Sequence, residues 1–455
     1  MTGERQPPHP VPRPPSAVSG AVGLVGLLGL GVWLYVARNF GEIAAALGYS
    51  GLPPIADGPY AALTGLAFCG VPMILWSVVV DRVHRRPSTG IDWSLRRPLE
   101  QSIDTSIVKL AGLWATWALI ALAYLAARWY WVEDSPYPFV MRLYGSAVVP
   151  LVLLSIPYML WIDTKLVEPR DGTWHFGAWI AGRGGWDGAA IAHHLRAWAV
   201  KGFFLTFMLS IVPGNFRETL GIDWGGALAD PVRLTYALIG LMFVIDVQVA
   251  TVGYLLTFRP LDSHIRTANP LLAGWVAALI CYPPFVLMGN GGPLDYHAAT
   301  SDWAHWLRQW PALLWLWGGL LVLLTAIYAW ATVAFGIRFS NLTHRGILTH
   351  GPYRLARHPA YVSKNAFWWC ATLPFLVTSG SAVDAVRNTL LLALVSAVYW
   401  WRAKTEESHL AADPDYLAYR AWSEGHAPWT RFVARLRRLR PPRDRVAASG
   451  HQPAE

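Results

Sequence analysis

Two polar stretches near the C-terminal end of the chain carry the side chains best suited to chemistry. The first, residues 341–361, ends in His358, Pro359 and Tyr361, and the second begins at Arg402. An imidazole, a phenol and a guanidinium can exchange protons or hold the charged groups of a ligand. Pro359 favours the first turn of a helix, whose free backbone amides attract an anion. These residue types predict a site that binds a charged small molecule.

The chain between the two stretches decides whether they meet. Apolar runs near 362–379 and 385–401 are separated by a short gap and predict a hairpin of two membrane spans. Arg402 would then return to the side of the membrane from which Tyr361 departs. Glu406 follows Arg402 at the i,i+4 spacing, so both side chains lie on one helix face. We therefore expect the two stretches to converge at one mouth of the membrane region.

The composition excludes a soluble enzyme. The chain has 455 residues, of which 54% are hydrophobic and 14% are charged, and its mean hydropathy is +0.32. A soluble domain carries about 25% charged residues, because water must wet its surface. The three cysteines fall in apolar runs without metal-ligand spacing, so we expect no metal site. The protein is therefore expected to be integral to the membrane.

Apolar runs along the chain predict an all-α, polytopic bundle of about ten transmembrane helices. The runs are longer than the ~10 residues of a barrel strand and lack alternation, which excludes a transmembrane β-barrel. Two of them, near 198–213 and 362–379, are short, and Tyr282 to Phe285 suggests a kink in a third. The runs lie near 18–36, 60–80, 107–127, 140–162, 198–213, 232–257, 270–289, 312–336, 362–379 and 385–401.

The distribution of Lys and Arg predicts the orientation of the bundle. With the N-terminus in the cytoplasm, most of the 37 Lys and Arg residues fall in cytoplasmic segments, as the positive-inside rule requires. Both termini and the mouth of the site are therefore expected in the cytoplasm. The net charge of +9 comes from these loops and from the tail 431–455, so we expect no nucleic-acid partner. The Pro-rich residues 1–17 predict a disordered cytoplasmic arm.

Several common catalytic signatures are missing from the sequence. It contains no GxxxxGKS/T phosphate loop, no HExxH, no GxSxG and no complete GxGxxG. An ABC-type ATPase, a zinc protease and an α/β-hydrolase therefore lack their main motifs.

The two polar stretches together carry a family resemblance. They read GPYRxxRHPxY at 351–361 and, after the apolar hairpin, RxxxEExxL at 402–410, followed by Asp415, Tyr416 and Tyr419. This pattern resembles the isoprenylcysteine carboxyl methyltransferase family. That family belongs to a wider group of integral-membrane methyltransferases that includes the phospholipid N-methyltransferases. The resemblance covers residues 338–425.

The resemblance implies methyl transfer from S-adenosylmethionine to a lipophilic acceptor that enters from the bilayer. It divides the chain into an N-terminal bundle of about eight spans (18–336), a methyltransferase-like module (337–430) and the basic tail (431–455). Arg402 would face the acceptor. The implied donor pocket consists of Arg345, Gly346, Ile347, Leu348, Tyr353, His358, Pro359, Ala360, Tyr361, Glu406 and Glu407.

His358, Arg402 and Glu406 are the candidate catalytic residues of this reaction. Methyl transfer is an in-line displacement between a nucleophile and a cation, so charge disappears in the transition state. Positioning and desolvation then supply most of the rate, and no metal is required.

The motifs say less about which residues would bind the methyl acceptor. Lys364 and Asn365 stand where family members often have a small residue, and they could shape the acceptor site. Asp246 lies inside a predicted span, where a carboxylate is costly, so it either faces the acceptor or joins helices by hydrogen bonds. The acceptor could be a prenylcysteine-like carboxylate, a phospholipid amine, or an isoprenoid or quinone-like lipid.

Two other functions fit part of the pattern. An NADPH-dependent membrane reductase of the sterol or steroid type has a similar C-terminal helical architecture, but RHPxY combined with a Glu-Glu pair favours a methyl donor. A non-enzymatic transporter or scaffold would spread charged residues through its spans, whereas here they gather at one mouth, apart from Asp246. The sequence leaves the oligomeric state open.

Overall fold

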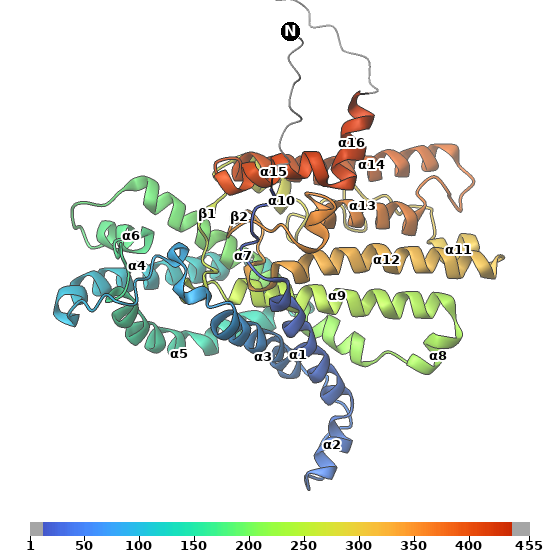
Figure 1. Ribbon diagram of the computed structural model, residues 1–455. Helices are drawn as coiled ribbons and strands as arrows, with labels where there is room; N and C mark the ends of the chain where they lie inside the picture. The colour runs from blue at the N-terminus through green and yellow to red at the C-terminus, as the bar shows by residue number, and fades with distance from the viewer. Residues whose placement is uncertain (1–11, 439–455) are drawn as a thin grey trace, which may run out of the picture.

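The computed structural model describes residues 12–438 and is almost entirely helical (Figure 1). Among these residues, eight helices are long and apolar enough to cross a membrane, so the protein is an integral membrane protein. These are α1 (Gly20–Arg38), α3 (Pro59–Leu75, continued by a π turn, Trp76–Val80), α4 (Leu99–Ala126), α5 (Tyr137–Asp163), α7 (Gly188–Leu220), α9 (Pro231–Leu255), α12 (Pro311–Phe335) and α14 (Ala382–Leu410).

The remaining elements are short and connect these helices. They are α2 (Phe40–Ala46), α6 (Gly172–Ile180), α8 (Trp224–Ala229), α10 (Leu272–Leu279), α11 (Trp303–Leu307), α13 (Pro359–Thr372), α15 (Pro414–His426), α16 (Pro428–Arg438) and the strands β1 (Thr267–Ala268) and β2 (Thr343–His344). Much of the predicted arm (1–17) and most of the predicted tail (431–455) lie outside the described residues.

Aspartates define where several helices begin. The side chain of Asp187 accepts hydrogen bonds from the first free backbone amides of α7, and Asp230 and Asp413 do the same for α9 and α15. Pro231 and Pro414 follow two of these caps at the first helical position, where proline's missing N–H costs nothing. The starts of these helices are therefore written locally in the sequence.

Two of the expected spans are not long helices. In the 270–289 run, only α10 is helical, because Tyr282 is followed by Pro283 and Pro284, which supply no backbone N–H to continue a helix. The 362–379 run forms α13, which ends where Leu373 turns into the left-handed region (φ 48°) before Pro374. The expected short run near 198–213 is instead part of the 33-residue helix α7.

Both short segments nevertheless run from one end of the bundle to the other. At one end, the N–H of Asn269 donates to the carbonyl of Leu342 (2.7 Å), just beyond the C-terminus of α12. At the other end, the Tyr236 hydroxyl near the start of α9 donates to Asp302, and the N–H of Thr378 donates to the carbonyl of Ala299 (2.8 Å). Both segments therefore traverse the bundle. Their crossing of a membrane stays a prediction.

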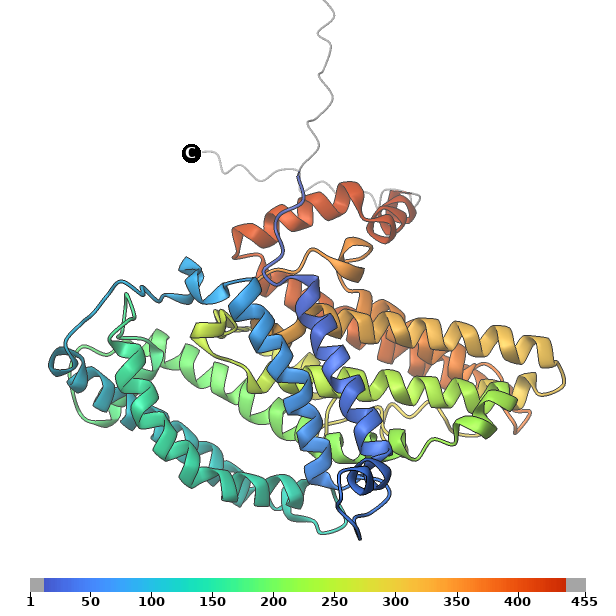
Figure 2. The same cartoon turned by 60° about the horizontal axis from the view of Figure 1, so that its bottom comes forward.

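Helix α9 lies at the centre of the molecule. In its most apolar stretch, 67% of the residues are buried, and the helix packs against α1, α3, α7 and α12. Figure 1 shows α9 and α12 side by side, with α1 and α3 crossing them. Figure 2 shows the same crossing from a turned view, with α4 and α5 paired at one side. One apolar core joins these central helices and includes Ile347 and Leu348, so it also fixes the loop that follows α12.

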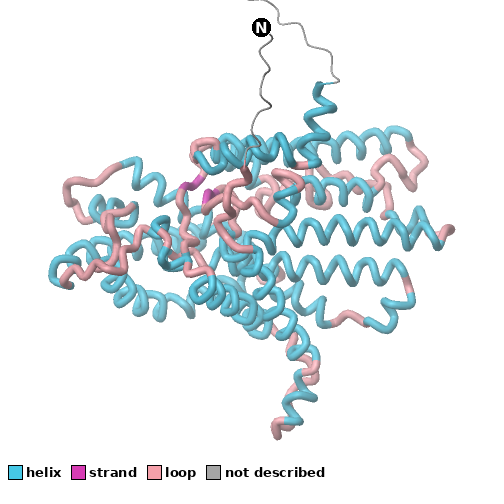
Figure 3. Tube along the Cα trace, viewed as in Figure 1, coloured by secondary structure: helices cyan, strands magenta, loops and turns pink. Residues whose placement is uncertain are grey.

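The loops that leave α9 and α12 meet at one place. Strand β1 follows α9 and pairs antiparallel with β2, which follows α12, with Thr267 opposite His344. Figure 3 shows these two strands among the loops. This small sheet ties the central bundle to the polar stretch 341–361.

Candidate active site

A cavity of about 190 Å³ lies where the two polar stretches meet. Its walls come from the end of α12, the loop 336–348, the start of α13, the last turns of α14 and two tyrosines of α15. Residues from both stretches line it, including His358, Tyr361, Arg402 and Glu406. The apolar hairpin thus returns the second stretch to the first.

Direct contacts join the start of α13 to the end of α14. The Tyr361 hydroxyl donates a hydrogen bond to Glu406. The His358 ring lies parallel to the Tyr361 ring and places Nδ1 3.7 Å from Glu406 Oε2. Glu406 therefore presents its carboxylate to the cavity beside an imidazole and a phenol.

Glu407 has a different environment from Glu406. It accepts from Lys404 Nζ (2.6 Å) and His358 Nε2 (3.2 Å), and Arg357 Nη1 lies 3.6 Å away. Glu407 is not among the residues that line the cavity. Glu407, which was predicted in the pocket for the methyl donor, therefore contacts His358 from outside the cavity lining. This geometry gives no support to a direct contact between Glu407 and a ligand.

The start of α13 offers unpaired backbone donors. Pro359 occupies its first turn, and the N-cap residue His358 makes no side-chain bond to the amides that follow. Ala360 and Tyr361 line the cavity at this terminus. A helix N-terminus of this kind stabilises a negatively charged group by its free N–H groups and its dipole.

The loop before α13 forms a second wall. Gly346 has φ +105°, and a Cβ there would lie 2.5 Å from both Ala17 Cβ and Arg338 Nη1, so only glycine fits. Ile347 and Leu348 are buried against the core and line the cavity. The N–H of Ala17 donates to the carbonyl of Ile347 (2.9 Å), so the start of the described chain covers this wall.

Arg345 is buried and holds the backbone together. Burial lowers the pKa of its guanidinium to about 9. All five N–H groups of an arginine side chain are used: Nε donates to the carbonyl of Ser263, Nη1 to those of Gly253 and Phe339, and Nη2 to those of Leu256 and Ile337. The side chain joins the ends of α9 and α12 and leaves no N–H for a ligand.

Helix α15 forms a further wall of the cavity, next to Tyr353. The Tyr419 hydroxyl donates to the carbonyl of Tyr353 (2.8 Å), and both rings are buried and line the cavity. Burial raises the pKa of Tyr353, so its hydroxyl stays neutral. Tyr416, the other tyrosine of the sequence pattern, lines the same wall.

The inner part of the cavity is an aromatic box around Arg402. Only 3% of Arg402 is exposed, and its guanidinium carbon lies 5.2 to 5.7 Å from the ring centres of Tyr282, Tyr361 and Tyr399. Nη2 donates to Asn341 Oδ1 (3.3 Å), whereas Nε has no hydrogen-bond partner among residues 12–438. A buried N–H without a partner is costly, and a polar ligand in the cavity would satisfy it.

Besides Arg402, the three other residues predicted on the acceptor side have different positions. Lys364 lines the cavity. Asn365 does not; its Nδ2 donates to the carbonyl of Tyr361 (2.8 Å). Asp246 also lies outside the lining and accepts from Tyr328 (2.9 Å) and Thr332, which are themselves wall residues. Asp246 thus joins α9 to α12, as one of the two alternatives from the sequence predicts.

Sequence reasoning missed the aromatic wall. Tyr282, Tyr328 and Tyr399 all line the cavity, but they come from three segments without a motif. Tyr282 precedes the Pro283-Pro284 pair and Tyr399 precedes Trp400, positions that are also typical of packing kinks and interfacial anchors. Only the spacing of Tyr399 and Arg402, one helical turn apart, could have pointed to it.

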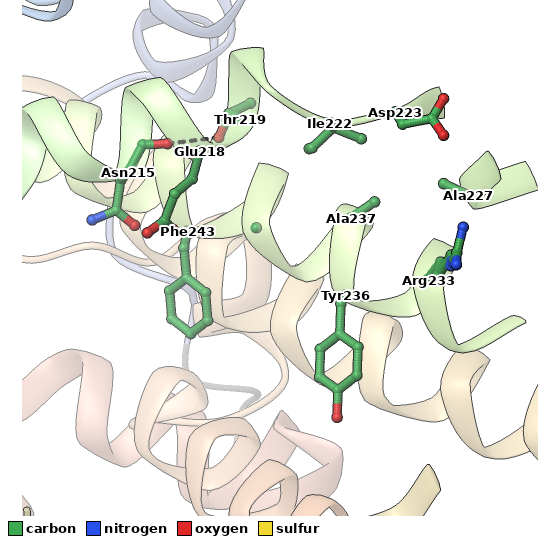
Figure 4. A pocket seen from close by; sticks show the side chains of 11 residues that line it. Asn215, Glu218, Thr219, Ile222, Asp223, Ala227, Arg233, Tyr236, Ala237 and Phe243 are labelled. Carbon is green, nitrogen blue, oxygen red and sulfur yellow. Dashed lines mark hydrogen bonds between the residues drawn. The ribbon is translucent and has the colours of Figure 1, made fainter. Parts of the chain in front are cut away.

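A larger cavity of about 460 Å³ lies at the opposite end of the bundle (Figure 4). It is lined by the end of α7, by α8 and by the start of α9, with Glu218, Arg233 and Tyr236 among its residues. Within α7, Thr219 Oγ1 donates to the carbonyl of Asn215 (2.8 Å). None of the sequence-predicted residues lies there. Within residues 12–438, no cluster of three or more His, Cys, Asp or Glu side chains could hold a metal ion.

The sequence of the chain was compared with those of known protein families and proteins. Residues 307–413 match the family described as phospholipid methyltransferase. The matched region includes α12, α13 and α14, and it confirms the family resemblance in the C-terminal part of the chain. It begins upstream of the predicted module boundary at 337, so α12 is part of the similar region. No curated protein and no solved structure matched the chain.

Proposed function

We propose that the protein transfers a methyl group from S-adenosylmethionine to a lipophilic acceptor that resides in the membrane. The observation that carries the proposal is one cavity that joins Glu406, His358 and the start of α13 inside the region similar to phospholipid methyltransferases. The acceptor is a prenylcysteine-like carboxylate or another lipid head group. The region supports a membrane methyltransferase in general, and the donor and acceptor are the specific parts of the proposal.

The donor half of the cavity has groups of the kinds that this donor needs. S-adenosylmethionine carries a sulfonium, an ammonium and a carboxylate, and when bound it supplies an electrophilic methyl group. Glu406 would accept from the ammonium, and the amides of Ala360 and Tyr361 would donate to the carboxylate. Ile347 and Leu348 would contact the apolar parts of the donor.

The protein's own residues would act by position and by exclusion of water. His358 and Tyr361 hold the Glu406 carboxylate, and Arg402 stands on the inner side, where the acceptor would enter. The reaction brings a nucleophile and a cation together, so alignment and desolvation lower its barrier.

The orientation is part of the proposal. The carbonyl of Ile347 accepts from Ala17 and the carbonyl of Tyr353 from Tyr419, so both ends of the described chain lie beside the cavity mouth. Arg357 lines the cavity, and Arg354 and Lys404 belong to the two polar stretches that form it. By the positive-inside rule this end faces the cytoplasm, from which the donor would enter.

Calorimetric binding of S-adenosylhomocysteine, the product of the donor, tests the proposal on detergent-purified protein. We expect micromolar binding by the wild type and a loss of about tenfold or more in Glu406→Gln, which keeps the shape of the side chain. Glu424→Gln is the matched control, because Glu424 is exposed and does not line the cavity. Binding of NADPH in place of S-adenosylhomocysteine would overturn the methyl-donor proposal, and so would binding of neither.

A further inference from the structure

Helix α16 has a strongly amphipathic sequence. Its apolar residues recur three and four positions apart, at 429, 432, 433 and 436. Arginines recur at 431, 435 and 438, which the helical repeat of 3.6 residues places on the opposite face. The sequence of the helix contains no acidic residue. This pattern is typical of a helix that lies in the interface between a bilayer and water.

Two aromatic side chains of α16 are open to the surroundings. Trp429 is 43% exposed and Phe432 is 50% exposed, and their ring centres lie 5.5 Å apart. Leu355 is also exposed, and the N–H of Trp429 donates to its carbonyl (3.2 Å), so the two residues are neighbours. We call these three residues the α16 patch. Large apolar side chains that are exposed together mark a surface that contacts another molecule or lipid.

Exposed arginines accompany the α16 patch. Arg354 precedes Leu355 in the chain, and Arg431 and Arg435 belong to α16. Within residues 12–438, no ion pair includes any of these three arginines. The carboxylate of Glu424 in α15 pairs with two other arginines. The surface therefore combines apolar side chains with positive charges that the described part of the chain does not neutralise.

An anionic lipid surface matches both properties of this region. The protein is integral to the membrane, and α15 and α16 follow the apolar helix α14 directly, so a bilayer lies close to α16. Figure 1 shows α16 at the edge of the molecule, running across the direction of α12. Acidic head groups would complement the arginines, and the acyl chains would complement the apolar face. An acidic protein would match the charge, but it would have to be recruited from solution, whereas the lipid is always near.

We propose that α16 docks on the bilayer surface by binding anionic lipid head groups. Trp429 and Phe432 would enter the interface, and Arg431 and Arg435 would reach the head groups on either side of the helix. The hydroxyls of Ser423 and Thr430 lie 3.2 Å apart and connect α15 to α16. Docking would therefore hold α15, one wall of the cavity, at the membrane surface.

Two bilayers of different charge test the proposal with the full-length protein in nanodiscs. One contains only phosphatidylcholine, and the other contains equal parts of phosphatidylcholine and phosphatidylglycerol. Phe432→Cys is labelled with the apolar fluorophore bimane, and lipids with a nitroxide near the head group serve as quenchers. The unsubstituted protein, labelled in the same way, gives the contribution of the native Cys69, Cys281 and Cys370. We expect strong quenching in the anionic bilayer and weak quenching in the neutral one.

Removal of two arginines should remove this difference between the bilayers. Arg431→Gln combined with Arg435→Gln lowers the attraction to an anionic surface by about fivefold for each charge. High salt, which screens charges at the surface, should act in the same direction. Arg420→Gln is the matched control, because Arg420 is exposed on α15 but already lies 3.8 Å from Glu424, and it should leave the difference unchanged. Unchanged melting temperatures show that the variants remain folded.

Three results would overturn the proposal. Weak quenching in both bilayers would show that α16 stays in water, and it would leave the surface to a protein partner. Strong quenching that is equal in both bilayers would show lipid contact without recognition of charge. An unchanged difference in the variant without Arg431 and Arg435 would remove these residues from the docking surface. The experiment needs neither a methyl donor nor an acceptor, so its outcome is independent of the proposed methyl transfer.

Discussion

Glu406 and Glu407 are neighbours in the chain, but their side chains have different partners. Glu406 meets Tyr361 and the cavity, whereas Glu407 is held by Lys404, His358 and Arg357 outside the lining. Two consecutive helical residues point about 100° apart, so a doubled acidic motif does not imply a doubled role. The motif itself cannot say which of the two faces the ligand.

We expect opposite effects from the two glutamine variants. Glu407→Gln removes partly exposed ion pairs and should cost about 1 kcal/mol of stability, with little effect on binding of S-adenosylhomocysteine. Glu406→Gln should reduce that binding and leave the melting temperature nearly unchanged. Calorimetry and thermal unfolding of both variants, side by side, check the assignment. An equal loss of binding in the two variants would contradict it.

Arg345 shows that a residue of the motif region can serve the backbone. Because its five N–H groups hold five carbonyls, a lysine could satisfy only part of them. Arg345→Lys should therefore lower the stability by about 2–4 kcal/mol, the cost of leaving buried carbonyls unpaired. Affinity for S-adenosylhomocysteine below the melting transition should stay within about threefold of the wild type. A selective loss of donor binding without loss of stability would instead assign the side chain to the ligand.

At the scale of elements, the loop between α9 and β1 should make the protein sensitive to acid. Burial, together with the charges of Arg259, Arg266 and Arg338, lowers the pKa of His264 to about 3, although Asp262 acts in the opposite direction. In the unfolded chain, the His264 ring takes up a proton near pH 6.5, whereas in the folded protein it does so only near pH 3. The folded protein therefore has its full stability above pH 6.5 and loses stability as the pH decreases below that value.

Between pH 7 and pH 5, His264 alone should remove at most about 2 kcal/mol of stability. Melting temperatures measured over this range in one detergent give the slope. His264→Asn cannot take up the proton, so its slope should be shallower than that of the wild type. Parallel slopes would show that other groups determine the acid sensitivity.

Also at the scale of elements, hydrogen bonds connect the start of the described chain to the donor half of the cavity. Thr349 donates to the carbonyl of Pro14 (2.9 Å), the hydroxyl of Ser16 bonds His350 (2.7 Å), and Arg86 donates to the carbonyl of Ala17 (2.6 Å). Residues 14–17 thus lie between the loop of the cavity wall and the segment after α3. Their hydrogen bonds connect that loop to the segment after α3.

Deletion of residues 1–17 should therefore weaken binding of S-adenosylhomocysteine by about three- to tenfold, since each lost hydrogen bond contributes about 1 kcal/mol. The apolar core does not depend on these residues, so the melting temperature should decrease by only a few degrees. Calorimetry and thermal unfolding on the truncated protein measure both. Full-strength binding after truncation would show that the loop is held without this segment.

At the scale of the whole molecule, the sequence predicted those parts of the fold that composition and local spacing determine. The all-α membrane bundle and the convergence of residues 341–361 with Arg402 and Glu406 both follow from composition or spacing. The lengths of α10 and α13 and the aromatic wall do not. Tyr282, Tyr328 and Tyr399 meet only through tertiary packing, and apart from the spacing of Tyr399 and Arg402 nothing in the sequence points to them.

The same packing argues that the C-terminal region is not an independent unit. Helix α12 lies against α9, β2 pairs with β1, and Arg345 donates a hydrogen bond to a carbonyl at the end of α9. A fragment that begins at residue 307 would lose all three partners and expose the apolar face of α12. We expect it to show no binding of S-adenosylhomocysteine when produced alone.

Production of residues 1–306 together with residues 307–455 tests this coupling. The break falls at the last residue of α11, just before α12, at the end of the bundle away from the cavity, so the two fragments can assemble without a cut in the site. Co-production should restore binding of S-adenosylhomocysteine to within about tenfold of the intact chain. Binding by the 307–455 fragment alone would show instead that the methyltransferase-like region folds on its own and that the preceding helices serve another purpose.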